Sequence, residues 1–351
     1  LLIVEDSQFM RSLIIGILRA LGVERILTAE NGEEAIAIMS PGAKKTQSMV
    51  GMIGVDIIVS DMFMPIVDGL MFLHWVRLSD KSPDRFLPFI MVSAAADRDI
   101  IIKSRDAGVN EFVAKPFSAE AVMQRIISVI ERPRQYVYCP TYFGPDRRRR
   151  AVNVPEDKRK MKESEIEVIH SGKEMGALRK SKKRVWYFRL PKSLRSKLAT
   201  GSADPNDPPF DPDLLKAAES KVNDMESDYA DWVGDSIEKL VQAHHRAIED
   251  MENAEGHLEE IHNVAHELRG QGGIFGYPLM TQFGKSLYET TGEGTVVNAQ
   301  VLDLINAHID LIKVVMSQKI KGDGGKIGKE LMQSLHEAKQ KFKRSTEGED
   351  G

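Results

Sequence analysis

The chain has 351 residues, with 48 Lys and Arg, 52 Asp and Glu, and a formal net charge of −4, values that are ordinary for a globular protein of about two domains. A single cysteine, Cys139, excludes an internal disulfide framework and is typical of a reducing compartment. No uninterrupted apolar run approaches the roughly 20 residues that a membrane-spanning helix needs, and the first residues lack the charged start of a signal peptide. We therefore expect a cytoplasmic protein without membrane insertion.

The first 132 residues alternate between short apolar runs and amphipathic patterns of helical spacing. The sequence predicts five strands, at about 1–4, 25–29, 57–60, 89–93 and 111–114. A helix is expected after each strand, and a polar insertion rich in Met and Gly occupies about 41–54. Strands that alternate with helices in this way predict an α/β doubly wound fold with a five-stranded parallel sheet.

Asp61 directly follows the apolar run 57–60, which predicts a buried strand. In an open α/β sheet, ligands bind at the carboxyl ends of the strands, so a carboxylate at this place is a candidate for chemistry. An Asp after a strand also commonly caps a turn or a helix. Taken alone, this stretch leaves both interpretations open.

Polar residues follow three other predicted strands as well. Glu5 and Asp6 come after the first strand, Ser93 ends the fourth, and Lys115 follows the fifth. Together these strands would place three carboxylates, a hydroxyl and an ammonium around one crevice. Clustered carboxylates repel one another, and a hard divalent cation such as Mg²⁺ offsets that repulsion. The set predicts a nucleophilic Asp beside a metal site, with Ser and Lys as donors to phosphoryl oxygens.

Residues 1–132 resemble the receiver domain of bacterial two-component response regulators, which has a flavodoxin-like fold. The resemblance rests on Glu5-Asp6, on Asp61 within the pattern Asp-x-x-x-Pro-x-x-x-Gly, on Ser93 and on Lys115-Pro116. It implies that Asp61 is the phosphoacceptor. It also implies that Lys115 pairs with the phosphoryl group and that Ser93 bonds one of its oxygens.

The same resemblance implies a cofactor and a switch. Asp6, Asp61 and the backbone carbonyl of Phe63 would hold Mg²⁺, with Glu5 supporting them. Phe112 stands where the family usually has Tyr, and it would swing inward together with the movement of Ser93.

A basic segment rich in Pro and Gly follows, and we expect residues 133–211 to form a linker. From Arg147 to Lys197 there are eighteen Lys and Arg against six Asp and Glu. Basic and aromatic residues interleave there, so nucleic-acid binding is an alternative. The segment has neither a zinc-ligand spacing nor a helix-turn-helix pattern, which makes nucleic acid the less favoured partner.

Residues 212–345 carry apolar positions at helical spacing and predict a bundle of four or more helices. Helices are expected at about 213–250, 254–275, 279–288, 298–318 and 326–343. His266 lies in the second of these, with Arg269, Gly270 and Gly273 three, four and seven residues after it. Glycine costs about 1 kcal/mol in a helix relative to Ala, so glycines beside one histidine suggest clearance for a partner. Arg269 would lie near an anion on the imidazole.

The pattern His-x-Leu-Arg-Gly, followed by a further glycine, resembles the histidine phosphotransfer (HPt) domain over about 228–345. The family's usual Lys is here Arg269. The resemblance implies that His266 carries a phosphoryl group and exchanges it with a receiver aspartate. His257, His262 and the pair at 244–245 are interpreted as surface or packing residues, because the spacing supplies no convergent metal ligands.

The sequence thus predicts a phosphorelay protein that accepts phosphate from a sensor histidine kinase or from another receiver domain. It has no Gly-rich ATP-binding loop, so we expect a phosphotransfer intermediate rather than a kinase. Two alternatives remain. The helical bundle could dock a partner with His266 silent, or the basic linker could bind nucleic acid.

Overall fold

The computed structural model describes residues 1–40, 54–94, 98–139, 141–147, 166–169, 185–188, 190, 194, 212–292 and 294–347. The insertion expected at 41–54, apart from Gly54, and most of the basic segment lie outside the described residues. The chain divides into two compact units. The first comprises 1–114 and 118–221, and the second comprises 115–117 and 222–351.

The first unit is built on a five-stranded parallel sheet with the order β2-β1-β3-β4-β5. Its strands are β1 (Leu2–Val4), β2 (Leu27–Ala29), β3 (Ile58–Asp61), β4 (Phe89–Ser93) and β5 (Glu111–Ala114). The strands β1, β3 and β4 are buried along their whole length, as their apolar sequences predicted. The strand order reverses next to β1, so the β1–β3 pair marks the crevice where such sheets bind ligands.

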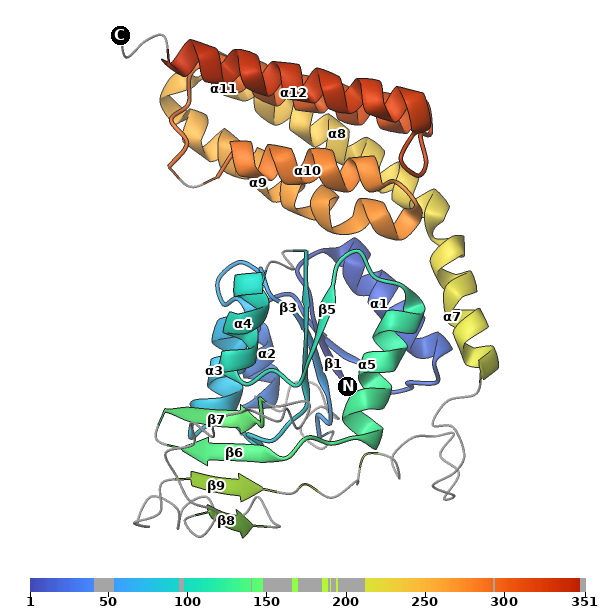
Figure 1. The fold of residues 1–351 in the computed structure, drawn as a ribbon, viewed down its shortest axis with the longest axis vertical. Helices are drawn as coiled ribbons and strands as arrows, with labels where there is room; N and C mark the ends of the chain where they lie inside the picture. Colours follow the sequence, from blue (N-terminus) through green and yellow to red (C-terminus); the bar gives the residue numbers. More distant parts are fainter. Residues whose placement is uncertain are drawn as a thin grey trace, which may run out of the picture. The chain divides into compact units, whose positions relative to one another are not determined.

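Helices cover both faces of this sheet. They are α1 (Gln8–Ala20), α2 (Gly32–Met39), α3 (Gly69–Leu78), α4 (Arg98–Ala107) and α5 (Ala119–Glu131). In Figure 1, α1 and α5 lie on one face, and α2, α3 and α4 lie on the other. Side-chain caps start four of them: Ser7, Asn31, Asp68 and Ser118 each accept a hydrogen bond from a backbone N–H of the first turn. The predicted α/β fold with a five-stranded parallel sheet is confirmed.

A second sheet follows in the segment that was predicted to be a linker. It contains β6 (Tyr136–Cys139), β7 (Tyr142–Pro145), β8 (Ile166–Ile169) and β9 (Val185–Phe188), in the order β7-β6-β9-β8. The β6–β7 and β6–β9 pairs are antiparallel, and the β8–β9 pair is parallel. The prediction of a linker over 133–211 therefore has to be corrected at β6 to β9, because the charged composition concealed short strands, three of which (β6, β7 and β9) bury aromatic side chains.

An aromatic cluster joins this second sheet to the α/β layer. Tyr136, Phe143, Trp186 and Phe188 pack with Phe86, which precedes β4. The ring of Phe86 meets the rings of Tyr136, Phe143 and Phe188 at centroid distances of 5.2 Å each, with interplanar angles of 60° to 80° that are typical of edge-to-face packing. This aromatic packing explains why strands within so basic a sequence fold against the α/β layer.

Arg77, in the last turn of α3, is fully buried beside that cluster. Its guanidinium donates to the carbonyl oxygens of Gly108, Arg85 and Leu87 at 3.0, 2.7 and 2.8 Å. It also donates to Asn110 Oδ1 at 2.8 Å. Burial lowers the pKa of Arg77, and the four acceptors offset the cost of desolvating its charge. The α3 helix, the α4–β5 turn and the loop before β4 are thereby held together.

The C-terminal part of the chain is helical, as predicted. Its elements are α7 (Pro212–Asp224), α8 (Glu226–Glu249), η5 (Met251–Asn253), α9 (Ala254–Gln271), η6 (Gly272–Phe275), α10 (Pro278–Thr290), α11 (Ala299–Ser317) and α12 (Gly325–Glu347). The helix expected at 213–250 is two helices that meet at Met225, because apolar spacing continues through the break and conceals it. The helix expected at 254–275 ends at Gln271. A Cβ on Gly272 would come within 2.7 Å of Tyr277 O and Met280 Cβ, so the chain tightens there into the 3-10 turn η6.

Candidate functional site

The first candidate site lies at the carboxyl ends of the parallel strands. Asp61 is the last residue of β3 and is only 2 % exposed, while Ser93 is the last residue of β4 and fully buried. Glu5 and Asp6 follow β1 directly. Glu5 is buried, whereas Asp6 is exposed. The topology therefore brings these four sequence-predicted residues to one edge of the sheet, beside the β1–β3 switch point.

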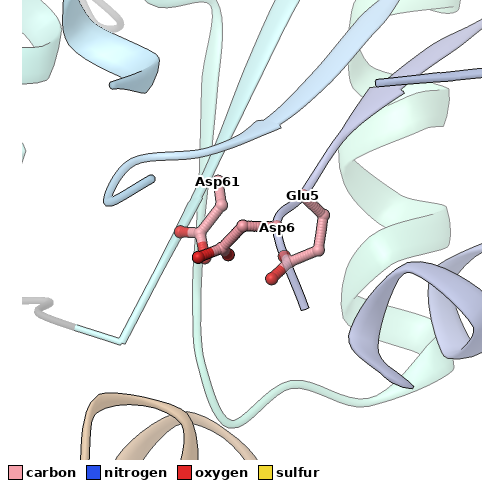
Figure 2. Close-up of side chains that lie close together, drawn as sticks. All are labelled: Glu5, Asp6 and Asp61. Atoms are coloured by element: carbon pink, nitrogen blue, oxygen red, sulfur yellow. The ribbon is translucent and has the colours of Figure 1, made fainter. Parts of the chain in front are cut away.

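The three carboxylates form a compact cluster. One oxygen from each of Glu5, Asp6 and Asp61 lies within 4.8 Å of the others. Figure 2 shows the carboxylates of Asp6 and Asp61 directed toward each other, with Glu5 beside them. The backbone N–H of Met62 donates to Asp61 Oδ1 at 2.6 Å, and that of Ser7 donates to Asp6 Oδ1 at 3.0 Å. These bonds fix both carboxylate orientations.

The donor set of this cluster suits a hard cation. All three side chains offer carboxylate oxygens, which Mg²⁺ prefers over nitrogen or sulfur ligands. Clustered negative charge is costly in a partly buried place, and a divalent cation offsets that cost. The residues at the ends of β1 and β3 therefore fit a Mg²⁺ ion. Phe63, whose carbonyl is the fourth predicted ligand, lies two residues after β3 and is partly buried.

The backbones of β3 and α3 approach each other closely next to the carboxylate cluster. A Cβ added to Gly69, the first residue of α3, would lie 2.0 Å from Asp61 O, a distance that no side chain tolerates. The Gly69 N–H donates to Met62 O at 2.9 Å and closes the loop between the two elements. Gly69 is thus required for the position of the backbone at Asp61.

Two other predicted residues belong to β5 and its end. Phe112 lies within β5, is partly buried and packs against the main apolar cluster of the α/β layer. Lys115 comes directly after β5, before Pro116. Residues 115–117 group with the second compact unit.

The second candidate site is on α9. His266 is partly buried, and Arg269 and Gly270, three and four residues later, are both buried. The Arg269 guanidinium carbon lies 4.7 Å from the ring centroid of Tyr288 on α10. Gly273 falls in η6, beyond the end of α9, so it does not share a helical face with His266 as the sequence predicted. The backbone N–H of Gly273 donates to Thr281 Oγ1 at 3.0 Å.

Tyr288 is the residue that sequence reasoning missed. Its ring contacts His266 at a centroid distance of 5.6 Å and an interplanar angle of 69°. The ring also stacks on His262, at 4.0 Å and 29°. Tyr288 follows His266 by 22 positions and belongs to another helix, so no local spacing signals the contact. Only the pairing of α9 with α10 brings it there.

The four histidines that were interpreted as surface or packing residues contact neighbouring groups. Burial lowers the pKa of His262, whose Nδ1 lies 3.1 Å from Thr291 Oγ1. His244 Nε2 lies 2.9 Å from Leu302 O, and His245 pairs with Glu249 at 3.2 Å. His257 lies 3.5 Å from Arg246 Nε. Among the described residues, the only group of three or more His, Cys, Asp and Glu that could hold a metal ion is the carboxylate cluster at Asp61.

No helix in the described part of the chain combines the length and the apolar character needed to cross a membrane.

Comparison with known proteins identifies relatives of the N-terminal part. Residues 1–127 match the family model described as the response regulator receiver domain. The chemotaxis protein CheY of Pseudomonas aeruginosa is 35 % identical over 132 residues, which are 38 % of this chain and 96 % of that protein. CheY-3 of Vibrio cholerae is 30 % identical over 132 residues, covering 38 % of this chain and 92 % of that protein. A structure of V. cholerae CheY4 has 27 % identity and a TM-score of 0.30, covering 36 % of this chain and 95 % of that one.

Proposed function

Because the chain belongs, through residues 1–127, to the response regulator receiver domain family, we propose that it is a phosphorelay signalling protein. In this proposal Asp61 accepts a phosphoryl group, and His266 carries or transfers one. The observation that carries the proposal is the placement of Asp61: a nearly buried carboxylate at the end of β3, with Glu5 and Asp6 within 4.8 Å.

Transfer to Asp61 is a displacement at phosphorus. A carboxylate oxygen of Asp61 forms the new P–O bond while the P–N bond to a donor phosphohistidine breaks, and the electron pair stays on the imidazole, which then takes a proton from solvent. The Met62 N–H, 2.6 Å from Asp61 Oδ1, orients the carboxylate for attack with its other oxygen. Ser93 and Lys115 would donate to the phosphoryl oxygens, and Phe112 would respond to the movement of Ser93.

A metal ion belongs to this proposal. Asp6, Asp61 and the carbonyl of Phe63 would be ligands of Mg²⁺, and Glu5 would support these ligands. When bound, the ion supplies positive charge beside the phosphoryl oxygens. The protein itself holds the three carboxylates together at the strand ends, so that they are already in place when the ion binds.

His266 is the second station of the proposed relay. The partly buried imidazole lies on α9 one turn before Arg269 and Gly270, and the Arg269 guanidinium would pair with the oxygens of a phosphoryl group on it. Exchange with an aspartyl phosphate breaks the P–O bond and forms a P–N bond, with the carboxylate as leaving group. The protein would act as a phosphotransfer intermediate, and a kinase would supply the phosphate.

The proposed partners follow from this chemistry. A sensor histidine kinase or another receiver domain would donate or accept phosphate, in the cytoplasm. Nucleic-acid binding is less favoured, because the aromatic residues Trp186 and Phe188 of the basic segment are buried in β9.

The test separates the two stations by the stability of their phosphate bonds. Wild type, Asp61→Asn and His266→Gln are each incubated with phosphorylated kinase or receiver. Phosphohistidine is labile in acid and aspartyl phosphate is labile in base. We expect base-labile label to vanish in Asp61→Asn and acid-labile label to vanish in His266→Gln.

Two results would contradict the proposal. If His266→Gln took up and passed on label as wild type does, the relay would be lost and the helical bundle would be left as a docking module. Base-labile label on Asp61→Asn would remove the assignment of the receiver acceptor.

A further inference from the structure

An aromatic ring links the residues around His266. Tyr288 is partly buried on α10, and its ring contacts side chains from three positions of α9: His262, His266 and Arg269. These three positions lie on one face of α9, at spacings of four and three residues. The contacts depend on the close approach of the two helices. A Cβ added to Gly284 on α10 would lie 2.6 Å from Arg269 N.

The ring of Tyr288 is itself held in place through His262. The two rings stack at a centroid distance of 4.0 Å. His262 Nδ1 lies 3.1 Å from Thr291 Oγ1, and the Thr291 hydroxyl donates its single proton to Leu287 O at 3.0 Å. The chain of contacts from Thr291 through His262 fixes the Tyr288 ring from the carboxyl end of α10.

His266 and Arg269 are the two side chains that this fixed ring orients. The His266 ring meets Tyr288 at 69°, a tilted arrangement that aromatic pairs favour. The Arg269 guanidinium carbon, 4.7 Å from the centroid, lies in the range of a cation–π contact. The Tyr288 ring thus contributes to the relative positions of the His266 imidazole and the Arg269 guanidinium.

We propose that Tyr288 is a positioning residue for phosphoryl transfer at His266, acting through its ring contacts with His266 and Arg269. The inference rests on the proposed role of His266. The ring keeps the imidazole in one orientation and keeps the guanidinium where the phosphoryl oxygens arrive, so that both groups are in place before the partner aspartate binds. A loss of such alignment lowers the rate of the step rather than the affinity for the partner.

The test compares Tyr288→Leu, which removes the aromatic face, with Tyr288→Phe, which keeps it. Transfer from a phosphorylated receiver to His266 is followed at increasing receiver concentration. We expect the maximal rate in Tyr288→Leu to fall about tenfold, with the half-saturating receiver concentration unchanged. Tyr288→Phe is expected to stay within about twofold of wild type, because the π face carries the contacts. Glu289→Gln, an exposed neighbour that pairs with Lys285 at 4.0 Å, is the matched control and should transfer as wild type does.

A second variant addresses the support of the ring. His262→Gln keeps a hydrogen-bonding group for Thr291 but removes the ring that stacks on Tyr288, and we expect the maximal rate to fall about threefold. Carbon relaxation of the His266 ring provides a readout that needs no phosphate. The ring should become more mobile in Tyr288→Leu and should keep its wild-type order in Tyr288→Phe.

The outcomes separate this inference from the proposed function. If wild type carries no label on His266 with any donor, the proposed function fails, and the relaxation measurement still decides whether Tyr288 orders the ring. If wild type is labelled and Tyr288→Leu transfers at the same rate, the positioning role is overturned and the relay stands. An equal loss in Tyr288→Leu and Tyr288→Phe would also overturn it, because the hydroxyl rather than the ring would then matter.

Discussion

The two candidate sites of this protein are built in different ways. The Asp61 cluster collects residues from the ends of β1, β3 and β4, which are far apart in the sequence and meet because parallel strands end at one edge. The His266 site takes three side chains from one face of α9 and adds one ring from α10. The first site depends on sheet topology, whereas the second depends on how closely two helices approach.

The two sites also differ in charge. Three carboxylates within 4.8 Å call for a cation before an anionic phosphoryl group can approach. His266 contacts the ring of Tyr288, which also contacts the Arg269 cation, and in the proposed relay this cation would pair with a phosphoryl group on His266. In the proposed relay, Asp61 would hold a phosphoryl group beside a metal ion, and His266 would hold one beside the cation of Arg269. If the two regions depend on different physical supports, a substitution in one should leave the other unchanged.

The largest effect is expected at Arg77, which supports only the first unit. Arg77→Ala removes the guanidinium that donates to the carbonyl oxygens of Gly108, Arg85 and Leu87, and a buried group left without its partner costs about 1–3 kcal/mol. Asn110 Oδ1 keeps the Phe89 N–H and the Tyr136 hydroxyl as donors. We expect the free energy of unfolding of the first unit to fall by about 4 kcal/mol, measured by urea titration.

The matched variant at this position is Arg77→Lys, which keeps the charge but cannot reach four acceptors. It should lie between wild type and Arg77→Ala. A stability of Arg77→Ala equal to that of wild type would mean that water replaces the guanidinium and that Arg77 does not hold α3, the α4–β5 turn and the loop before β4 together.

A pair of glycines gives the sharpest comparison between the sites. A Cβ at Gly69 would lie 2.0 Å from Asp61 O, and one at Gly284 would lie 2.6 Å from Arg269 N. Overpacking of this kind costs about 1–3 kcal/mol. Gly69→Ala should lower label on Asp61 and spare His266, while Gly284→Ala should do the reverse. Thermal unfolding of each variant gives the cost, and Gly54→Ala, where a Cβ meets nothing within 4 Å, is the control. Equal loss at both stations in either variant would show that the sites are not separately supported.

The helical region should respond to acid through His308. This histidine is fully buried on α11; its Nδ1 donates to Leu304 O at 2.7 Å, and its Nε2 accepts from Ser286 Oγ at 2.8 Å. Burial lowers the pKa of His308 from 6.5 to about 4. The unfolded chain therefore binds a proton below pH 6.5 that the folded bundle does not bind until about pH 4. Stability is full above pH 6.5 and is lost as the pH falls toward 4.

The expected loss for His308 is on the order of 2 kcal/mol over that range. Urea unfolding followed by helical circular dichroism at pH 7, 6, 5 and 4 measures it. His308→Gln should flatten the pH dependence, whereas His336→Gln, at an exposed histidine of α12, should leave it as in wild type. An unchanged slope in His308→Gln would assign the acid sensitivity to other groups.

The smallest expected effect is that of Mg²⁺ on the first unit. At about ten times its Kd the ion should stabilise the folded protein by about 1.4 kcal/mol, and EDTA should remove that gain. Asp6→Asn takes one carboxylate from the cluster and should abolish the shift, while Asp99→Asn, on the exposed side of α4, should not. The unfolding midpoint in urea with and without the ion is the measurement. A gain that persists in Asp6→Asn would place the ion elsewhere.

The comparison also explains which residues could be predicted. Asp61, Ser93 and the Glu5-Asp6 pair were predictable, because strand ends of a parallel sheet must meet at one edge and the strands were visible as apolar runs. His266 and Arg269 were predictable because a helix fixes the relation of residues three and four apart. Gly273 was misplaced because the helix pattern does not show where tertiary contacts at Gly272 end the helix.

By itself, the sequence determined the parallel sheet, the acidic cluster at its edge and the helical C-terminal region, since these follow from local periodicity and from the fixed geometry of strands and helices. Only the tertiary structure decided that aromatic strands within the basic segment pack beside the buried Arg77, and that Tyr288 lies against His266 and Arg269. Both contacts join residues distant in the chain and are made by the packing of apolar and aromatic surfaces, which has no fixed spacing in the sequence.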